Sequence, residues 1–265
     1  RTFRHQPKMT SRWPRADREG ANDSSLDTKD IERFAFDSHA DARADVSGKY
    51  GFAGELLDLF VQNSGAVVHK WHHYIPLYDR YFARFRGTSL RFLEIGVSKG
   101  GSLQMWRKYF GDSAVIFGID IDPLCRQYDG KFGSVRIGSQ VDTSFLDEVV
   151  REMGGVDVVL DDGSHHMDHI PVTLRHLFPL LSFRGIYMIE NLHTAYWRQW
   201  GGGFGVEKNF FRYTGDIVDN MHRWYHDDAP RCAAFADTCS GVHIHDSIVV
   251  LEKDAVHRPT HSRHG

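Results

Sequence analysis

The strongest constraint on the fold is an alternation of short apolar runs with amphipathic segments. The apolar runs, each read as a strand, are LRFLEIG (90–96), AVIFGIDID (114–122), SVRIGSQ (134–140), VDVVLDD (156–162) and GIYMIEN (185–191). Between them, segments such as SLQMWRKYF repeat apolar residues at helical spacing, with Ser102 as the expected cap of that helix. Strands alternating with helices at this spacing predict an α/β fold with a doubly wound, mostly parallel sheet.

The flanking parts of the chain show other patterns. VHIHDSIVVLEK (242–253) reads as one or two strands with no helix between them, which suits an antiparallel C-terminal edge strand. Residues 31–88 look helical in pieces and form the expected small N-terminal helical extension. Residues 1–30 are polar and lack an apolar period, so we expect a mobile arm. The ligand-binding domain is then 89–254, and 255–265 is expected to be a disordered tail.

Composition limits the partners and the compartment. The chain has 265 residues and a net charge of −3, which gives no indication of a nucleic-acid partner. No stretch approaches the ~18 apolar residues of a membrane span, and the first residues lack the apolar region of a signal peptide. The sequence starts without Met, so an upstream piece is expected. Cys125, Cys232 and Cys239 cannot all pair, so we expect free thiols in a reducing cytoplasm.

Polar residues follow the ends of all five predicted strands. They are Glu94 with the Gly96–Gly101 loop, Asp120 and Asp122, Ser139 and Gln140, Asp161 and Asp162 with His165, and Glu190 and Asn191 with His193. Ligands of open α/β sheets bind beyond the carboxyl ends of the strands, so we expect these residues at one ligand site.

The glycines permit a tight turn and close approach of a ligand, but their spacing is not the GxGxxG of dinucleotide-binding proteins. Read alone, the loop also fits a purely structural turn. Asp120 lies roughly 20 residues beyond it, where a ribose-binding acid is expected. Its carboxylate can accept both ribose hydroxyls. Alone, Asp120 or Asp122 fits a solvated turn as well.

Asp162 and Glu190 end neighbouring or near-neighbouring strands. Because carboxylates repel each other at close range, the pair calls for a cation. With Asn191 they form an all-oxygen set that suits Mg²⁺. His165, three residues after Asp162, is a natural general base. The register of the aspartates is open, so Asp161 is an alternative to Asp162.

Two other interpretations of this segment remain. In the first, the aspartates cap the following helix and the histidines are surface residues. In the second, the histidines form a zinc or iron site. The second requires at least two of His165, His166, His169 and His193 to converge.

The segments FLEIGVSKGGSLQMWRKYF, VIFGIDIDP, VVLDDGSH and YMIENLHTAYW resemble the class I S-adenosylmethionine (SAM)-dependent methyltransferases. The chain is most similar to the metal-dependent sugar O-methyltransferases of macrolide and polyketide biosynthesis, the mycinamicin group. Cephalosporin hydroxylase-like proteins share this core, and catechol O-methyltransferase is a more distant relative. The resemblance covers roughly residues 68–253, and its motifs are specific as a set. It implies a Rossmann-like fold, with SAM and Mg²⁺ as cofactors.

The resemblance also implies the activity: methylation of a sugar hydroxyl in a glycosylated natural product or sugar precursor, in antibiotic-type biosynthesis. It implies that SAM is bound by Glu94, Gly96, Gly100, Gly101, Ser102, Asp120, Asp122, Ser139, Gln140 and Asp161. Asp162, Glu190 and Asn191 would ligate Mg²⁺, and His165 would act as the base with Asp162 beside it. The sugar enzymes have Asp where this chain has Asn191, which removes one negative charge and weakens metal binding. Catechol O-methyltransferase is similar to this chain in having Asn. The sugar enzymes also carry a larger N-terminal region.

The loop HTAYWRQWGGGFG (193–205) follows the fifth strand. Its aromatic residues among glycines suggest a mobile cover for the substrate, formed by His193, Tyr196, Trp197 and Trp200. The alternative is packing at a subunit interface, and we expect a homo-oligomer. NFFRYTGDIVDNMHRWYH is a candidate for contact with a second chain. Tyr74 and Tyr78 are expected in a helix core rather than at the substrate.

Other functions remain open at this stage. One is a cephalosporin hydroxylase-like enzyme on the same fold, and another is a methyltransferase for a non-sugar hydroxyl. A nicotinamide-dependent oxidoreductase is disfavoured by the glycine spacing. A non-catalytic SAM or nucleotide sensor would not need His165 beside a metal site. The expected partner is a small glycosylated acceptor, with neither nucleic acid nor membrane.

Overall fold

A seven-stranded sheet forms the centre of the computed structural model, which describes residues 40–227 and 232–265. The proposed arm at 1–30 lies outside the described residues. The strands are β1 (Arg91–Ile95), β2 (Val115–Asp120), β3 (Ser134–Ile137), β4 (Val156–Asp161), β5 (Leu181–Ile189), β6 (Cys239–His245) and β7 (Ile248–Lys253), in the spatial order β3-β2-β1-β4-β5-β7-β6. The predicted doubly wound, mostly parallel α/β sheet is confirmed.

The first five strands are parallel, and β7 runs antiparallel to both of its neighbours. The expected antiparallel strand therefore lies one place inside the edge. A tight turn at residues 246–247 folds β7 back against β6, and β7 takes the position beside β5. The strand at the edge is β6.

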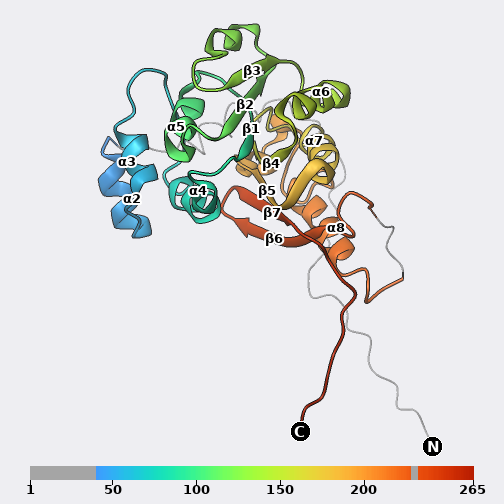
Figure 1. Ribbon diagram of the computed structural model, residues 1–265. Coiled ribbons are helices and arrows are strands. Elements are labelled where there is room, and N and C mark those ends of the chain that lie inside the picture. The colour runs from blue at the N-terminus through green and yellow to red at the C-terminus, as the bar shows by residue number, and fades with distance from the viewer. Residues whose placement is uncertain (1–39, 228–231) are drawn as a thin grey trace, which may run out of the picture. The chain divides into compact units, whose positions relative to one another are not determined.

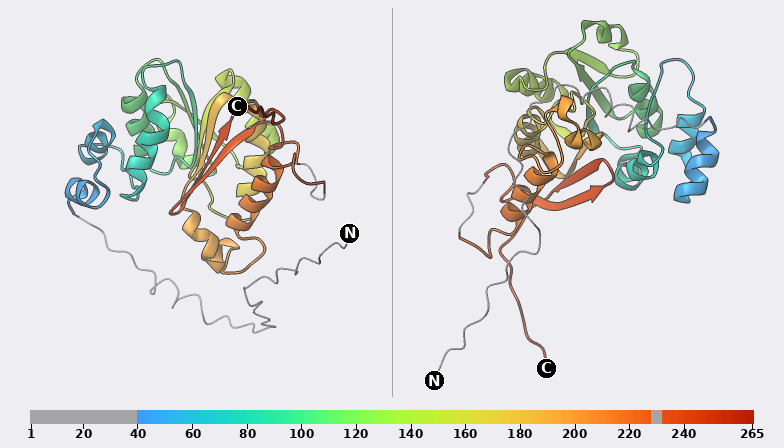
Figure 2. Two further views of the ribbon diagram at one scale, coloured as in Figure 1. Left: turned by 90° about the horizontal axis from the view of Figure 1, so that it is seen from below. Right: turned by 180° about the vertical axis from the view of Figure 1, so that it is seen from behind.

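Helices lie on both faces of the sheet (Figure 1). On one side are α2 (Ala42–Tyr50), α3 (Glu55–Val61), α4 (Tyr74–Phe82) and α5 (Gly101–Phe110), and on the other α6 (Thr143–Met153), α7 (Ile170–Leu177) and α8 (Phe210–Met221). The left view of Figure 2 shows the sheet between these two layers. Short 3₁₀ turns, η1 (Ala83–Phe85), η2 (Pro123–Tyr128), η3 (Phe178–Leu180), η4 (Leu192–Tyr196) and η5 (Arg198–Trp200), complete the chain. None of the helices in the described part is long and apolar enough to cross a membrane.

Each strand serves both apolar layers because successive side chains point to opposite faces. On β1, Phe92 packs on the side of α4 and α5, whereas Leu93 packs on the side of α6 and α7. On β4, Leu160 and Val159 divide in the same way. This alternation also decides which face each residue at a strand end reaches.

The helical extension shares the core of the sheet. Tyr78 and Phe82 of α4 are fully buried, with ring centroids 5.2 and 5.7 Å from that of Trp106 on α5. Burial of a large apolar side chain contributes roughly 1.5–3 kcal/mol, so α4 is firmly anchored. The segment that enters α4 is thereby fixed near the ends of the strands.

One local prediction at the start of a helix needs correction. Ser102 does not cap α5: the helix begins after Gly100, and the Ser102 hydroxyl donates to Glu94 at 2.8 Å. Helix α8, a candidate for contact with a second chain, buries Phe210 and Ile217 in its own core. Pro171 lies in the first turn of α7, where its missing N–H is tolerated.

Candidate active site

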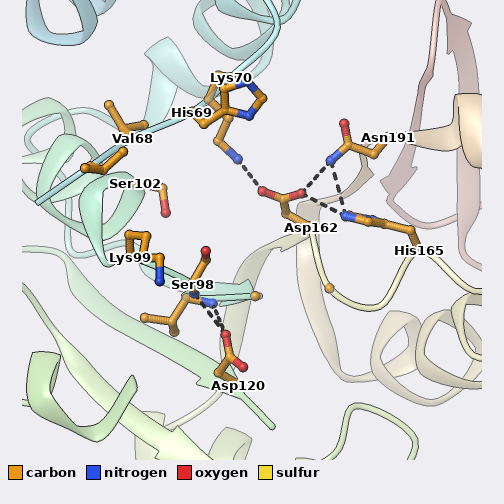
Figure 3. A pocket seen from close by; sticks show the side chains of 14 residues that line it. Val68, His69, Lys70, Ser98, Lys99, Ser102, Asp120, Asp162, His165 and Asn191 are labelled. Atoms are coloured by element: carbon orange, nitrogen blue, oxygen red, sulfur yellow. Dashed lines mark hydrogen bonds and ion pairs between the residues drawn. The ribbon is translucent and has the colours of Figure 1, made fainter. Parts of the chain in front are cut away.

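A cavity of about 340 Å³ opens beyond the carboxyl ends of the strands. Its walls are Val67–Lys70, Gly96–Lys99 with Ser102, Asp120, Asp162, Gly163, His165 and Asn191. Figure 3 shows these side chains directed into one space. An adjoining hollow of about 170 Å³ includes Ser139 and Gln140 in its lining and shares Gly96, Asp120 and Gly163 with the first. Several of the strand-end residues expected at one edge line these two spaces, among them Asp120, Gln140, Asp162, His165 and Asn191.

Pleating brings carboxylates to the same side of the sheet. Asp161 and Ile189 are register partners on β4 and β5, so the next residues, Asp162 and Glu190, emerge side by side toward α4. Asp161 is buried on the opposite face, where the Tyr187 hydroxyl donates to it at 3.1 Å. Burial raises the pKa of Asp161 to about 7. The structure thus places Asp162, and not Asp161, beside Glu190 and Asn191.

A lysine joins the two carboxylates. Nζ of Lys70 lies 2.6 Å from Oδ2 of Asp162 and 2.7 Å from Oε1 of Glu190, and its side chain is only 2% exposed. Tyr78 donates its hydroxyl to the other oxygen of Glu190. Burial disfavours the charged ammonium, but the surrounding carboxylates outweigh it and raise the pKa of Lys70. The point between the carboxylates is therefore one that favours positive charge.

The pKa values of the two carboxyl groups are shifted in opposite directions. Burial and the charge of Asp162 raise the pKa of Glu190 well above its usual range. Burial also opposes ionisation of Asp162, but the Lys70 ammonium holds the pKa of that carboxyl below its usual value.

On its other side, Asp162 meets Asn191 and His165 (Figure 3). Its Oδ1 accepts a hydrogen bond from the Asn191 amide at 2.7 Å and lies 3.6 Å from Nε2 of His165. Asn191 and His165 both have left-handed backbone, with φ of 59° and 56°. Such strain in non-glycine residues is common at functional sites. Burial lowers the pKa of His165, so the imidazole is neutral near pH 7 and can accept a proton.

The donor set fits a hard divalent cation. Asp162, Glu190 and Asn191 bring carboxylate and amide groups from adjacent strand ends, and the Lys70 ammonium shows that a cation is stabilised between the carboxylates. Which end of the Asn191 amide faces Asp162 follows from the hydrogen-bond network, and rotation would present its oxygen instead. Within residues 40–227 and 232–265, no three His, Cys, Asp or Glu side chains cluster as a metal site, so this set depends on the amide oxygen.

The alternative zinc or iron site finds no group of three or more metal-binding side chains among the described residues, although the rings of His166 and His169 lie 5.1 Å apart. Nδ1 of His169 lies 2.9 Å from the Ser164 hydroxyl, and Nδ1 of His193 lies 2.7 Å from that of Ser247. Burial lowers the pKa of His193 to about 4. These rings are held by different hydroxyl groups, and His165 is the histidine that faces Asp162.

The glycine loop is held against two other parts of the site. At Gly96, where φ is 96°, a Cβ would lie 2.1 Å from the Asp162 carbonyl oxygen. At Gly101, a Cβ would lie 2.2 Å from the Val67 carbonyl carbon. Asp120 fixes the loop by accepting the N–H groups of Val97 and Ser98, both at 2.9 Å. The loop is therefore a close-packed junction as well as a cavity wall.

Other predicted cofactor residues take more structural positions. Asp122 is exposed and caps η2 through the Leu124 N–H at 2.9 Å, outside both cavity linings. Glu94 is fully buried and accepts hydrogen bonds from Ser102 and Trp106. Burial raises the pKa of Glu94 to about 7, although Lys70 opposes the shift. Gln140 accepts the N–H of Ser164 at 2.6 Å and so fixes the turn after β4.

The aromatic loop divides between the site and α8. The His193 ring lies 5.4 Å from that of Trp71 and 4.9 Å from that of Trp197. The Trp200 ring lies 5.9 Å from that of His165. Tyr196 instead stacks on Phe211 of α8 at 5.6 Å. Tyr196 was one of four residues expected to contact the substrate, but its ring packs against a neighbouring helix instead.

Sequence reasoning missed Lys70 and Trp71 and assigned Tyr74 and Tyr78 to the core alone. Both tyrosines are indeed buried, yet the hydroxyl of Tyr74 donates to Asn191 at 3.2 Å and that of Tyr78 donates to Glu190. The signal was a lysine inside the apolar and aromatic run VVHKWHHY, since a lysine in such a setting is usually paired.

No family model matches the chain. Among curated proteins, it is 36% identical over 215 residues to the 8-demethyl-8-(2-methoxy-alpha-L-rhamnosyl)-tetracenomycin-C 3'-O-methyltransferase of Streptomyces olivaceus, covering 76% of this chain and 54% of that protein. It is 33% identical over 211 residues to the demethylmacrocin O-methyltransferase of Streptomyces fradiae, covering 74% and 53%. The chain spans about half the length of the curated relatives it matches.

Comparison with solved structures shows similarity to the same group of enzymes. The MycE methyltransferase of the mycinamycin pathway, crystallised with Mg and SAH, superposes with a TM-score of 0.68 at 29% identity, covering 76% of this chain and 55% of that one. Its complex with Mg, SAH and mycinamycin VI gives the same TM-score at 30% identity, covering 76% and 54%.

Proposed function

Since the chain has the fold of SAM-dependent methyltransferases and its curated homologues are sugar O-methyltransferases of macrolide and polyketide biosynthesis, we propose that it is itself an O-methyltransferase. The acceptor is a sugar hydroxyl of a glycosylated small molecule, the methyl donor is SAM, and Mg²⁺ is the metal cofactor.

One observation carries this proposal: Asp162, Glu190, Asn191 and His165 converge beside a polar cavity at the carboxyl edge of the sheet. A SAM or nucleotide sensor would use the glycine loop and Asp120, but it has no need of a neutral imidazole beside two carboxylates. A base next to a cation site suits methylation of a hydroxyl group, because the base can take the proton and the cation stabilises the negative charge that develops on the oxygen.

We assign the roles as follows. Asp162, Glu190 and Asn191 would hold Mg²⁺, and the bound cation would make an acceptor hydroxyl easier to deprotonate. The neutral Nε2 of His165 takes the hydroxyl proton, and Asp162 stabilises the imidazolium that forms. The loop Gly96–Gly101 lines the part of the cavity that would hold the methionine end of SAM. Its rigid junctions fix the donor relative to the acceptor, so proximity and orientation supply much of the rate.

The hollow lined by Ser139 and Gln140 suits the adenine, next to Asp120 for the ribose. The rings of Trp71, His193 and Trp197 present apolar faces suited to a sugar ring or aglycone. The three cysteines are free thiols, in keeping with the cytoplasmic location that we propose. Phe204, which is 94% exposed, is a candidate contact in a homo-oligomer.

The test is calorimetric titration with SAM and, separately, with NAD⁺, each in Mg²⁺ and in EDTA. We expect micromolar SAM binding and no NAD⁺ binding. A methylation assay with rhamnosylated acceptors, followed by mass spectrometry, should then show a gain of one methyl group that EDTA abolishes. Failure to bind SAM in either buffer would overturn the proposal.

A further inference from the structure

We propose that Lys70 is a positioning residue: its ammonium holds Asp162 and Glu190 side by side before a divalent cation binds and, by sharing this pair, sets how tightly that cation is held. The inference rests on the metal site of the proposed function, but it concerns a residue outside the metal-ligand set.

The contacts of Lys70 are those of a built-in counter-ion. Its Nζ bridges Oδ2 of Asp162 and Oε1 of Glu190 at 2.6 and 2.7 Å, with its side chain almost completely buried. The remaining oxygens are bonded to Asn191 and Tyr78. All four carboxylate oxygens thus have a partner from the protein, so the pair is ordered without a metal. Without Lys70, the buried Glu190 carboxylate and the partly exposed Asp162 carboxylate would face each other without a counter-ion.

The backbone on both sides of Lys70 is anchored to neighbouring helices. The segment before it is docked on α5, where the Gln104 side chain accepts the Ala66 N–H at 3.3 Å and donates to the Ser64 carbonyl at 2.9 Å. Gly101 lets the Val67 backbone lie directly against that helix. Helix α4 begins four residues after Lys70 and is anchored by its aromatic side chains. Being held on both sides, the lysine has little freedom to turn away.

Charge then determines the effect on the metal. A divalent cation held by Asp162 and Glu190 would share these carboxylates with the Lys70 ammonium and would be repelled by it at short range. The ammonium also satisfies part of the negative charge that would attract the cation. Lys70 and the uncharged amide of Asn191 together lower the affinity of this site for a divalent cation, so that the metal can exchange.

The experiment compares the wild-type chain with Lys70→Met, which keeps the length of the side chain and removes its charge. Lys70→Gln is a second variant that retains an N–H donor if the Met variant folds poorly. Lys108→Met, an exposed lysine on α5, is the matched control. Binding of Mn²⁺ and Mg²⁺ is measured by calorimetry, thermal stability by circular dichroism in EDTA and in Mg²⁺, and SAM affinity separately.

We expect the neutral variants to bind Mn²⁺ at least about tenfold more tightly than the wild type. In EDTA they should melt at a lower temperature, and Mg²⁺ should recover more of that loss than it adds to the wild type. Lys108→Met should match the wild type. A merely structural lysine would lower stability without tightening the metal. Unchanged or weaker metal binding, or no binding in any of the proteins, would overturn the inference. Loss of SAM binding by the wild type would overturn the proposed function instead, because the metal comparison does not use SAM.

Discussion

The contacts of each side chain at a strand end depend on the face of the sheet to which it points. Asp161 and Asp162 are adjacent in sequence, yet one is buried against Tyr187 and the other is bonded to Lys70 and Asn191. The same alternation brings Glu190 beside Asp162. His165 reaches them because its backbone takes a left-handed conformation, which turns the chain sharply after β4.

Replacing His165 tests the general base. His165→Ala should lower kcat by ~10²–10⁴-fold while leaving the dissociation constant of SAM unchanged, because the imidazole faces Asp162 rather than the hollow assigned to adenine. Single-turnover methylation and calorimetry would measure the two quantities. His257→Ala, in the exposed tail, is the control and should behave as wild type. A full rate in His165→Ala would remove this residue from the mechanism.

Paired substitutions test which aspartate holds the metal. Asp162→Asn should weaken Mg²⁺ binding by ~10-fold or more, because it removes a carboxylate that faces Glu190 and Asn191. Asp161→Asn should leave Mg²⁺ affinity within about twofold of wild type, since this side chain points to the opposite face. Metal titration of both variants measures the difference. The reverse order would mean that the assignment to Asp162 is wrong.

Much of this arrangement was predictable at the residue level, and two parts were not. The acids, amides and His165 stand out because each directly follows a strand pattern. The choice between Asp161 and Asp162 depends on register with β5, which no local pattern gives. Lys70 was missed because its partners lie 92 and 120 residues further along the chain, beyond the reach of any spacing rule.

At the scale of elements, the site depends on the contact between α5 and the segment that precedes α4. The central strands and helices were predicted well because each has a strong period and clear end signals. The start of α5 was mispredicted because a glycine in left-handed conformation ends the loop and the serine turns inward to Glu94. The junction between α5 and the segment before α4 is a tertiary contact that helix periodicity does not report.

That junction can be tested at Gly101. Gly101→Ala should destabilise the protein by about 1–3 kcal/mol and weaken SAM binding, since the new methyl group would overlap the Val67 backbone. Gly215→Ala is the matched control: it lies within α8 with open space around it, and it should stabilise by about 0.5–1 kcal/mol. Urea denaturation of both variants gives the free energies. Equal effects would show that no close contact exists at Gly101.

The opposite end of the sheet carries an ion pair that makes stability depend on pH. Arg91 of β1 donates to both oxygens of Asp157 on β4, at 2.6 and 3.0 Å, and to Ser182 of β5 at 2.7 Å. Burial opposes ionisation of Asp157, but these hydrogen bonds outweigh it and lower its pKa. A lowered folded-state pKa contributes stability above the unfolded pKa, roughly 4, and this contribution is lost as pH falls through the folded value.

Asp157→Asn should therefore lower the free energy of unfolding by about 1–2 kcal/mol at pH 7, discounted for partial exposure of the pair. The difference from wild type should stay constant down to about pH 4 and shrink below it. Denaturation curves at pH 7, 4 and 3 would measure this. A difference that grows as pH falls would contradict the sign of the shift.

For the molecule as a whole, the sheet and its two apolar layers followed from the alternation of strands and helices. The relation between the N-terminal helical extension and the sheet was harder to predict from the sequence. A boundary near residue 88 is natural from the sequence, yet the helices before it share their core with the sheet, and Tyr74, Tyr78 and Lys70 all contact the site. Trp71, from the same region, has its ring 5.4 Å from that of His193.

The path of the segment that carries Lys70 has a consequence for how the protein matures. During synthesis this lysine leaves the ribosome before Asp162 and Glu190, which lie 92 and 120 residues further along the chain, so its contacts with them can form only after those residues have emerged. Until then, neither the ammonium nor the carboxylates have their native partners. A shortened gene that begins at the first strand would still encode every residue of the recognisable motifs, but its product would lack the ammonium group that bridges Asp162 and Glu190.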